Sequence, residues 1–297
     1  GGNSMNSKAI KRQLLAAIAM VLVAAIALGS STYAWFVASG SVTAKDMKVN
    51  VQSSGGLVIS YAGEKDAWGV TASGQMTASK ALTPVSTSDM TDWSTAQAKV
   101  ANSYEFDKTT IKNVKNDVLP NGTYADANTY AVMRAFKIRS AAPGQLCKGL
   151  YVEKIEVSGS DNTLDTSLRV GFRYKYASGT GEYGETSSFI TGPVTVTSTS
   201  GQSEQNGPTA TYKFYSTKDT AENEAKAVTL TDVGKNARIV PASTEVTNGT
   251  DKPVYVEIFI WFEGQDQNLF SDNVKAIDNM DITVTFTSDS MAENPTV

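Results

Sequence analysis

The chain has 297 residues, a charged fraction of 19% and a formal net charge of -4, so no basic surface for gathering nucleic acid is expected. It contains one cysteine and no histidine. These counts exclude an intramolecular disulfide, a Ser-His or Cys-His catalytic pair and a histidine-ligated zinc site, and we therefore predict a protein that is not an enzyme and has no cofactor.

The N-terminal region has the three parts of a secretory signal. A basic stretch precedes an apolar run over residues 14–28, and small residues follow that run. We predict a signal peptide over residues 1–34, which a signal peptidase cuts between Ala34 and Trp35. The residues ahead of Met5 are typical of a vector-derived extension. Only this segment of the precursor is expected to contact a membrane.

Two other interpretations of the same segment stay open. The apolar run is short for a membrane span, which needs about 20 apolar residues, but residues 33–37 extend it beyond the Gly-Ser-Ser break. A retained anchor is therefore the first alternative. A type IV pilin helix is the second, although the glutamate usual just inside that helix is missing.

Alternation of apolar and polar residues with a period of two dominates after residue 40 and predicts β-strands. The segments with this pattern are residues 47–51, 57–61, 130–139, 150–157, 168–176, 254–262 and 282–287. Gly55-Gly56 predicts a hairpin between the first two segments. Residues 254–262 are apolar on both faces, which indicates a central strand. We therefore predict an all-β fold, an antiparallel β-sandwich over residues 53–297.

Two long polar stretches interrupt the strand pattern. Residues 62–129 and 177–252 are rich in Ser, Thr, Gly, Asn and Asp, and we interpret them as insertions between strands of the sandwich. Short helices are expected within them at residues 91–100 and 220–227, because Ala and Glu favour helices.

A few side chains are candidates for binding. Glu263, Asp266 and Asp272 follow the apolar strand, and their oxygens could hold Ca²⁺, although a turn capped by these acids explains them equally simply. Trp68 and Trp93 are expected to be core anchors unless they are exposed. Cys147 is expected to be a buried small hydrophobe.

Short motifs also resemble a known family. They are Gly29–Phe36 (GSSTYAWF), Ser41–Ala44, Ala81–Thr87, Pro143-Gly144 ahead of Leu150–Val157, and Ile260–Gly264. They resemble the TasA and camelysin group, proteins that Gram-positive bacteria export through a SipW-type signal peptidase, and clostridial members in particular. The match is best over the first 60 residues, and it does not extend to the two polar stretches.

This resemblance implies a jelly-roll-like sandwich that is secreted to the cell surface and assembles into pilus-like fibres of a biofilm matrix. Camelysin-like members have been called metalloproteases. That activity is not carried over to this chain, because it has no histidine.

Fibre assembly has a physical rationale in β-strand donation. Signal cleavage frees residues 35–52, which can complete the sheet of another copy, and such head-to-tail addition gives filaments. The expected anchors are Trp35, Phe36, Val37, Val42, Met47, Val49 and Val51. The alternative is that residues 41–51 pair within their own domain.

Two functions are therefore compared. The first is a structural subunit of an extracellular fibre or matrix, with a second copy of the chain as partner. The alternative is an adhesin that recognises glycans or host proteins through aromatics on the insertions, such as Trp68 or Trp93.

Overall fold

The computed structural model divides the chain into two compact units, residues 1–40 and residues 41–297. The residues that it describes are 17–21, 42–45, 48–53, 56–62, 67–75, 80–98, 106–118, 130–141, 146–158, 168–177, 181–191, 211–216, 225–246, 252–265, 277–278 and 281–292. In the first unit, residues 17–21 are helical and Ile18, Met20 and Val21 are exposed. No helix within the described ranges is long and apolar enough to cross a bilayer. The predicted cleavage site at Ala34 and Trp35 lies outside them.

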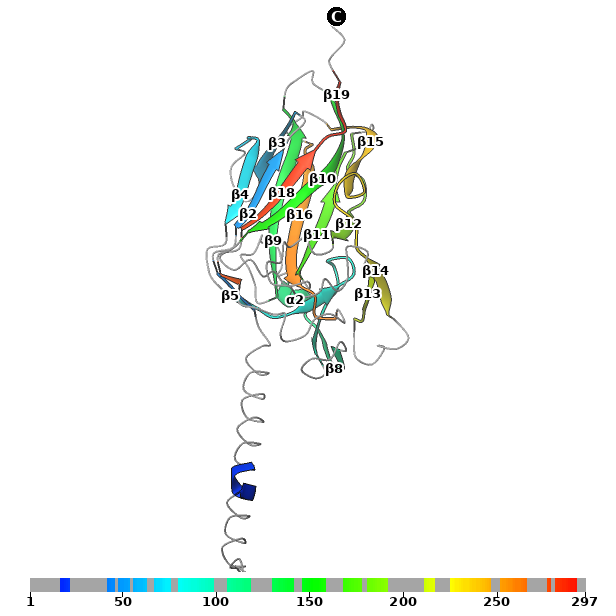
Figure 1. Cartoon of the computed structure of the whole chain (residues 1–297). Helices are drawn as coiled ribbons and strands as arrows, with labels where there is room; N and C mark the ends of the chain where they lie inside the picture. The colour runs from blue at the N-terminus through cyan, green and yellow to red at the C-terminus, as the bar shows by residue number, and fades with distance from the viewer. Residues whose placement is uncertain are drawn as a thin grey trace, which may run out of the picture. The chain divides into compact units, whose positions relative to one another are not determined.

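The second unit is all-β and mostly antiparallel, with two large sheets (Figure 1). The first large sheet has the strand order β15-β10-β18-β2-β4, and β19 also pairs with β10. Its strands are β2 (Lys48–Ser53), β4 (Thr71–Gln75), β10 (Leu146–Ser158), β15 (Arg238–Val246), β18 (Asp281–Thr287) and β19 (Ser290–Ala292). This is the six-stranded sheet in the text below.

The second large sheet, called the five-stranded sheet, has the order β12-β11-β16-β9-β3. All its pairs are antiparallel. Its strands are β3 (Leu57–Tyr61), β9 (Ala131–Ser140), β11 (Leu168–Lys175), β12 (Ser187–Thr191) and β16 (Val254–Phe262). β16 lies in the middle, which confirms the prediction of a central strand.

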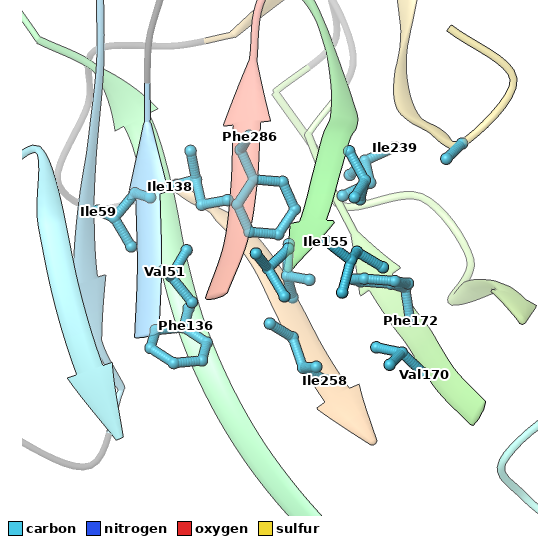
Figure 2. Close-up of a cluster of buried hydrophobic side chains, with 14 of the residues drawn as sticks. Val51, Ile59, Phe136, Ile138, Ile155, Val170, Phe172, Ile239, Ile258 and Phe286 are labelled. Carbon is cyan, nitrogen blue, oxygen red and sulfur yellow. The ribbon is translucent and has the colours of Figure 1, made fainter. Parts of the chain in front are cut away.

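The two large sheets share one hydrophobic core (Figure 2). The six-stranded sheet contributes Val51 and Phe286, and the five-stranded sheet contributes Phe136, Phe172 and Ile258, all of them fully buried. The rings of Phe172 and Phe286 meet edge to face with their centroids 6.3 Å apart. Because burial of one such side chain stabilises a fold by roughly 1.5–3 kcal/mol, this core holds the two sheets face to face.

A second core lies on the outer face of β16 and explains why this strand is apolar on both faces. There Phe259 and Trp261 pack on Trp93, with ring centroids 5.9 and 5.3 Å from the Trp93 ring. The elements that contribute to this outer layer are β6 (Val85–Thr87), β7 (Trp93–Ala98), β8 (Phe106–Asn113), α2 (Lys115–Val118), β13 (Thr211–Phe214) and β14 (Lys226–Thr229). Cys147 is buried in the first core, as predicted.

The N-terminal strands pair with segments from the C-terminal end of the chain. β1 (Val42–Lys45) lies between β5 (Lys80–Leu82) and β17 (Ile277–Asp278) in a small sheet, and β2 lies beside β18. Both the β1–β17 and the β2–β18 pairs are parallel. A parallel pair needs a long connection, and here most of the domain serves as that connection.

The predicted hairpin between residues 47–51 and 57–61 is wrong. β2 joins the six-stranded sheet and β3 joins the five-stranded sheet, so the chain changes layers at this turn. The turn uses Gly56 at a φ of 75°, and the Ser53 hydroxyl donates a hydrogen bond to the Leu57 carbonyl at 2.8 Å. Val51 and Ile59 thereby enter the same core from opposite sheets. Alternation alone does not show which partner a strand takes.

The two predicted helices are also wrong within the described residues. Residues 93–98 of the first form strand β7, and β14 begins at Lys226 inside the second. Pairing of β7 with β6 and β8, together with full burial of Trp93, outweighs the weak helix preference of the Ala-containing segment.

The stretches predicted to be insertions also supply strands to the sandwich. β4 lies within residues 62–129, and β12 and β15 lie within residues 177–252. Their sequences are polar because they lie at the edges of the two sheets, where several of the side chains of β12 and β15 are exposed. The two stretches also supply β5 of the small sheet and the strands of the outer layer.

Candidate functional site

The residues predicted to drive polymerisation fall on β1 and β2 where the structure describes them. Val42 pairs with Leu82 of β5. Val49 and Val51 lie between β18 and β4, and Val51 is fully buried in the shared core. The other predicted anchors lie outside the described residues: Trp35, Phe36, Val37 and Met47.

β2 is thus an interior strand of its own six-stranded sheet. Its backbone pairs with β18 from residue 48 to residue 53 and with β4 from residue 48 to residue 52. Residues 42–45 and 48–53 therefore pair within their own domain, as the alternative stated above required.

Glu263 belongs to the interior and contacts protein donors. The Trp261 indole N–H donates to its Oε2 at 3.1 Å, and the Gln265 backbone N–H donates to its Oε1 at 3.0 Å. The Gly264 N–H donates to the Val85 carbonyl at 3.0 Å, which joins the end of β16 to β6. Within the described ranges no group of three or more Cys, Asp or Glu side chains is placed to hold a metal ion. The other two predicted Ca²⁺ ligands, Asp266 and Asp272, lie outside those ranges.

The environment of Glu263 changes its acidity. Complete burial raises the pKa of this carboxyl to about 7, because a buried charge loses its hydration. Ser86, Trp261, the Gln265 N–H and the charge of Arg169 oppose this rise, since each stabilises the ionised form. A group that is neutral below about pH 7 and charged above it therefore lies between β16 and the outer layer.

Gln265 links three segments through its side-chain amide. Its Oε1 accepts the Tyr215 backbone N–H at 2.7 Å, and its Nε2 donates to the Tyr215 carbonyl at 3.0 Å and to Ser94 Oγ at 2.9 Å. The Ser94 hydroxyl in turn donates to the Tyr215 carbonyl at 2.7 Å. We call Ser94, Tyr215 and Gln265 the glutamine clamp. It fastens β7 and the segment after β13 to the end of β16.

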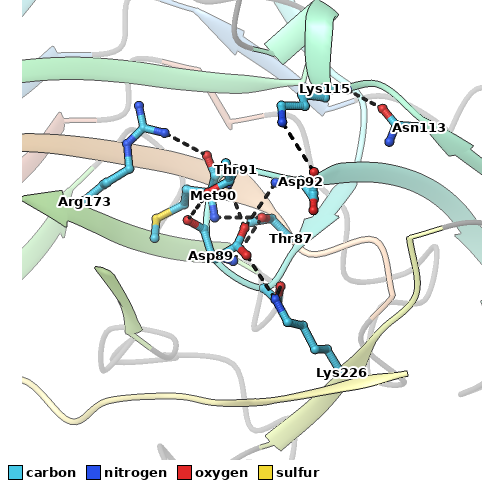
Figure 3. Close-up of polar contacts among 10 residues, drawn as sticks. Thr87, Asp89, Met90, Thr91, Asp92, Asn113, Lys115, Arg173 and Lys226 are labelled. Atoms are coloured by element: carbon cyan, nitrogen blue, oxygen red, sulfur yellow. Dashed lines mark hydrogen bonds and ion pairs between the residues drawn. The ribbon is translucent and has the colours of Figure 1, made fainter. Parts of the chain in front are cut away.

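The loop over residues 87–92 is a second connection of the outer layer, because it contacts both β14 and β11 (Figure 3). Asp89 Oδ1 accepts the backbone N–H groups of Thr91 and Asp92 at 2.8 and 3.1 Å, and Lys226 donates to its Oδ2 at 3.1 Å. Burial alone raises the pKa of Asp89, but these hydrogen bonds outweigh it and the pKa is lowered. The carboxylate therefore acts as a structural acceptor that orders the loop.

Met90 holds the same loop against β11. Its backbone has a φ of 58°, which is unusual for a residue with a side chain, and the side chain is fully buried. A Cβ atom at Gly171 would lie 2.1 Å from the Met90 sulfur, so the loop can pack this closely only on a glycine. Arg173 Nη1 also donates to the Met90 carbonyl at 3.4 Å. These contacts are architectural and supply no reactive group.

The tryptophans proposed for the adhesin function differ in exposure. Trp93 is fully buried in the second core, so it cannot be a sugar platform. Trp68 is half-buried, and the guanidinium carbon of Arg139 lies 4.2 Å from the centre of its ring. Trp68 is thus the only one of the two that is partly exposed.

A further aromatic group lies on the outer face of the five-stranded sheet. The half-buried rings of Tyr183 and Tyr255 are 5.6 Å apart, and Lys175 Nζ lies 5.3 Å from the centre of each. The Tyr183 hydroxyl donates to the Pro253 carbonyl at 2.9 Å, which fixes that ring. This tyrosine–lysine group was not predicted, because its members come from three separate segments.

The glutamine clamp was also missed from the sequence. Ser94 lies in a stretch that was predicted to be a short helix, and Gln265 belongs to a polar run interpreted as a turn or a Ca²⁺ site. The only signal was that this run directly follows the most apolar strand of the chain.

Comparisons with protein families, with curated proteins and with solved structures find no match for this chain. The resemblance to the TasA and camelysin group therefore stays a prediction from short motifs.

Proposed function

We propose that the chain is a secreted structural surface protein, a subunit of an extracellular fibre or matrix that assembles by exchange of its N-terminal strand. One observation carries this proposal. Among the described strands of the six-stranded sheet, β2 and β18 form the only parallel pair.

The order of the other strands supports a jelly-roll-like sandwich into which β2 is inserted. β2 is parallel to β18 and antiparallel to β4, so β4 runs antiparallel to β18. Without β2, the sheet would therefore be antiparallel throughout. From β9 to β18 the chain also crosses repeatedly between the two large sheets, which is typical of a jelly roll.

A second copy can supply the same strand with the same contacts. The hydrogen bonds to β18 and β4 are main-chain bonds, and Val51 fills a place in the shared core whichever copy provides it. When each copy passes β2 to the next copy, and not back to the copy that it received a strand from, the exchange does not close and produces a filament. Because the monomer fills its own place, assembly requires β2 to leave first and is expected to be slow.

The test is electron microscopy of the protein that begins at Trp35, incubated at high concentration. Filaments are expected, whereas persistent monodisperse particles contradict the proposal. A protein that begins at residue 54 should form no filaments and should bind a synthetic peptide of residues 35–53. A peptide of the same composition in scrambled order is the matched control.

The tyrosine–lysine group favours a second candidate, an adhesin that binds glycans as a monomer. Half-buried tyrosine rings beside a lysine offer an apolar face and a hydrogen-bond donor to a sugar. On this candidate, Tyr255→Ala lowers glycan binding at least tenfold on a glycan array and leaves filaments unchanged. An unchanged array signal would remove the tyrosine–lysine group as the binding site.

A further inference from the structure

The glutamine clamp places a nucleophile against an acyl group in the protein interior. Ser94 is fully buried and Gln265 is 1% exposed. The Ser94 oxygen accepts the Gln265 amide N–H at 2.9 Å, so the amide carbon lies one bond farther away. The fold thus holds the two groups side by side, and the oxygen has only to move over the face of the amide to reach its carbon.

We propose that Ser94 and Gln265 form an intramolecular ester cross-link with release of ammonia. The Ser94 oxygen attacks the side-chain amide carbon of Gln265, and a C–O bond forms as the C–N bond breaks. The hydroxyl proton passes to the departing nitrogen, which leaves as ammonia. The step needs no oxidant, reductant or second substrate.

The Tyr215 backbone positions the groups that take part in this step. Its backbone N–H lies 2.7 Å from Gln265 Oε1, the atom that becomes negative when the carbon is attacked. Its carbonyl accepts the Ser94 hydroxyl at 2.7 Å and the Gln265 amide at 3.0 Å, so it holds nucleophile and leaving group side by side. Glu263 Oε1 fixes the Gln265 backbone at 3.0 Å.

Burial favours the ester once it has formed. Water is the competing nucleophile that would hydrolyse it, and both partners are shielded from water. Ammonia, in contrast, is lost to the solvent, so the reverse reaction has little substrate.

The cross-link would stabilise the fold of this chain in the way that a disulfide stabilises other exported proteins. One cysteine cannot form an intramolecular bridge, whereas the ester joins positions 171 residues apart in sequence. It would fasten the outer layer covalently to β16. The ester can form whether or not the chain assembles into filaments.

Intact mass measurement of the purified full chain under denaturing conditions tests this proposal. The expected mass is that of the sequence less one ammonia. A wild-type protein found wholly at the mass of its sequence overturns the proposal and leaves the clamp a set of hydrogen bonds.

Peptide mapping locates the bond and provides the control. Trypsin should yield one joined species that contains residues 81–99 and residues 239–275, the two fragments with Ser94 and Gln265. Asn-Gly sequences at residues 121–122, 206–207 and 248–249 can also lose ammonia, so Ser94→Ala is the matched variant. Recovery of the full mass in Ser94→Ala supports the ester, and an ammonia loss that persists in it overturns the proposal.

Discussion

The two large sheets of the sandwich differ in how the chain builds them. The five-stranded sheet is antiparallel throughout and carries the outer layer on its far face. The six-stranded sheet takes in β2 beside the C-terminal strand β18, in a parallel pairing that is slightly weaker for each residue. One sheet is therefore fixed by the core and the outer layer together, while the other contains the strand that we propose is exchanged between copies.

The largest effect is expected for a core residue of the five-stranded sheet. Phe172 is fully buried and contacts Phe286 across the core, so Phe172→Ala should lower the free energy of unfolding by about 3–5 kcal/mol. Urea unfolding followed by tryptophan fluorescence measures it. The neighbouring Phe189 is only half-buried, and Phe189→Ala should cost clearly less. Equal costs for the two variants would contradict the placement of this core.

The next effect is a dependence of stability on pH. Because the pKa of Glu263 is raised from 4.5 to about 7 in the folded state, the folded chain holds an extra proton between these values. The stabilisation that this proton gives to the folded state is complete below pH 4.5. As the pH rises through 7 it is lost, and the free energy of unfolding falls by up to about 3 kcal/mol. Thermal unfolding across this range measures it.

Glu263→Gln is the matched variant for this pH effect. The amide imitates the protonated carboxyl and does not titrate, so the variant should unfold at a temperature that changes less between pH 5 and pH 8. A variant with the same pH profile as the wild type would show that another group is responsible. Hydrogen exchange should place the change in the outer layer and β16, and leave β2 unaffected.

A smaller effect is expected in β2 itself. Val51→Ala removes two methyl groups from the core and should cost about 2 kcal/mol. The proposed strand exchange requires β2 to open by itself, so hydrogen exchange should become faster in residues 48–53 and change little in β11. Uniformly faster exchange through both large sheets would argue that β2 opens only when the whole domain unfolds.

The smallest effects concern ion pairs on the two sheets. Arg173 and Glu257 pair across β11 and β16, where both side chains are partly buried at 21% and 28% exposure, while Lys154 and Glu156 on β10 are 59% and 50% exposed. Glu257→Gln should therefore cost about 1 kcal/mol and Glu156→Gln at most about 0.5 kcal/mol. Chemical denaturation at low and high salt measures both. A larger loss for Glu156→Gln would contradict the difference in burial.

The sequence predicted the strands that carry both alternation and length. Residues 168–176 and 254–262 were found because one face of the first and both faces of the second are apolar. The polar face of the first is not all exposed, because Arg169 on that face is only 1% exposed. Because the chain has no histidine, catalytic pairs and zinc sites that depend on histidine could be excluded. The central strand was recognised because only a strand covered on both sides is apolar on both faces.

The sequence could not predict which strands pair with each other or which polar side chains come into contact. Period-two alternation places Val51 toward a core but says nothing of the neighbour, so a hairpin was predicted where the chain changes sheets. Ser94 and Gln265 are 171 residues apart and have ordinary polar side chains, so only the fold brings them together. Val49 was selected for its position near the new N-terminus, and the structure adds that its strand is paired on both sides.

The most direct test of strand exchange is to lock β2 in place. Asn50 and Thr283 are register partners on β2 and β18, and adjacent strands lie about 4.8 Å apart, which suits a disulfide. The variant Asn50→Cys/Thr283→Cys, beginning at Trp35, should remain monomeric when oxidised and form filaments after reduction, as seen by negative-stain microscopy. Filaments from the fully oxidised variant would contradict the account, because assembly would then proceed while β2 stays in its own sheet.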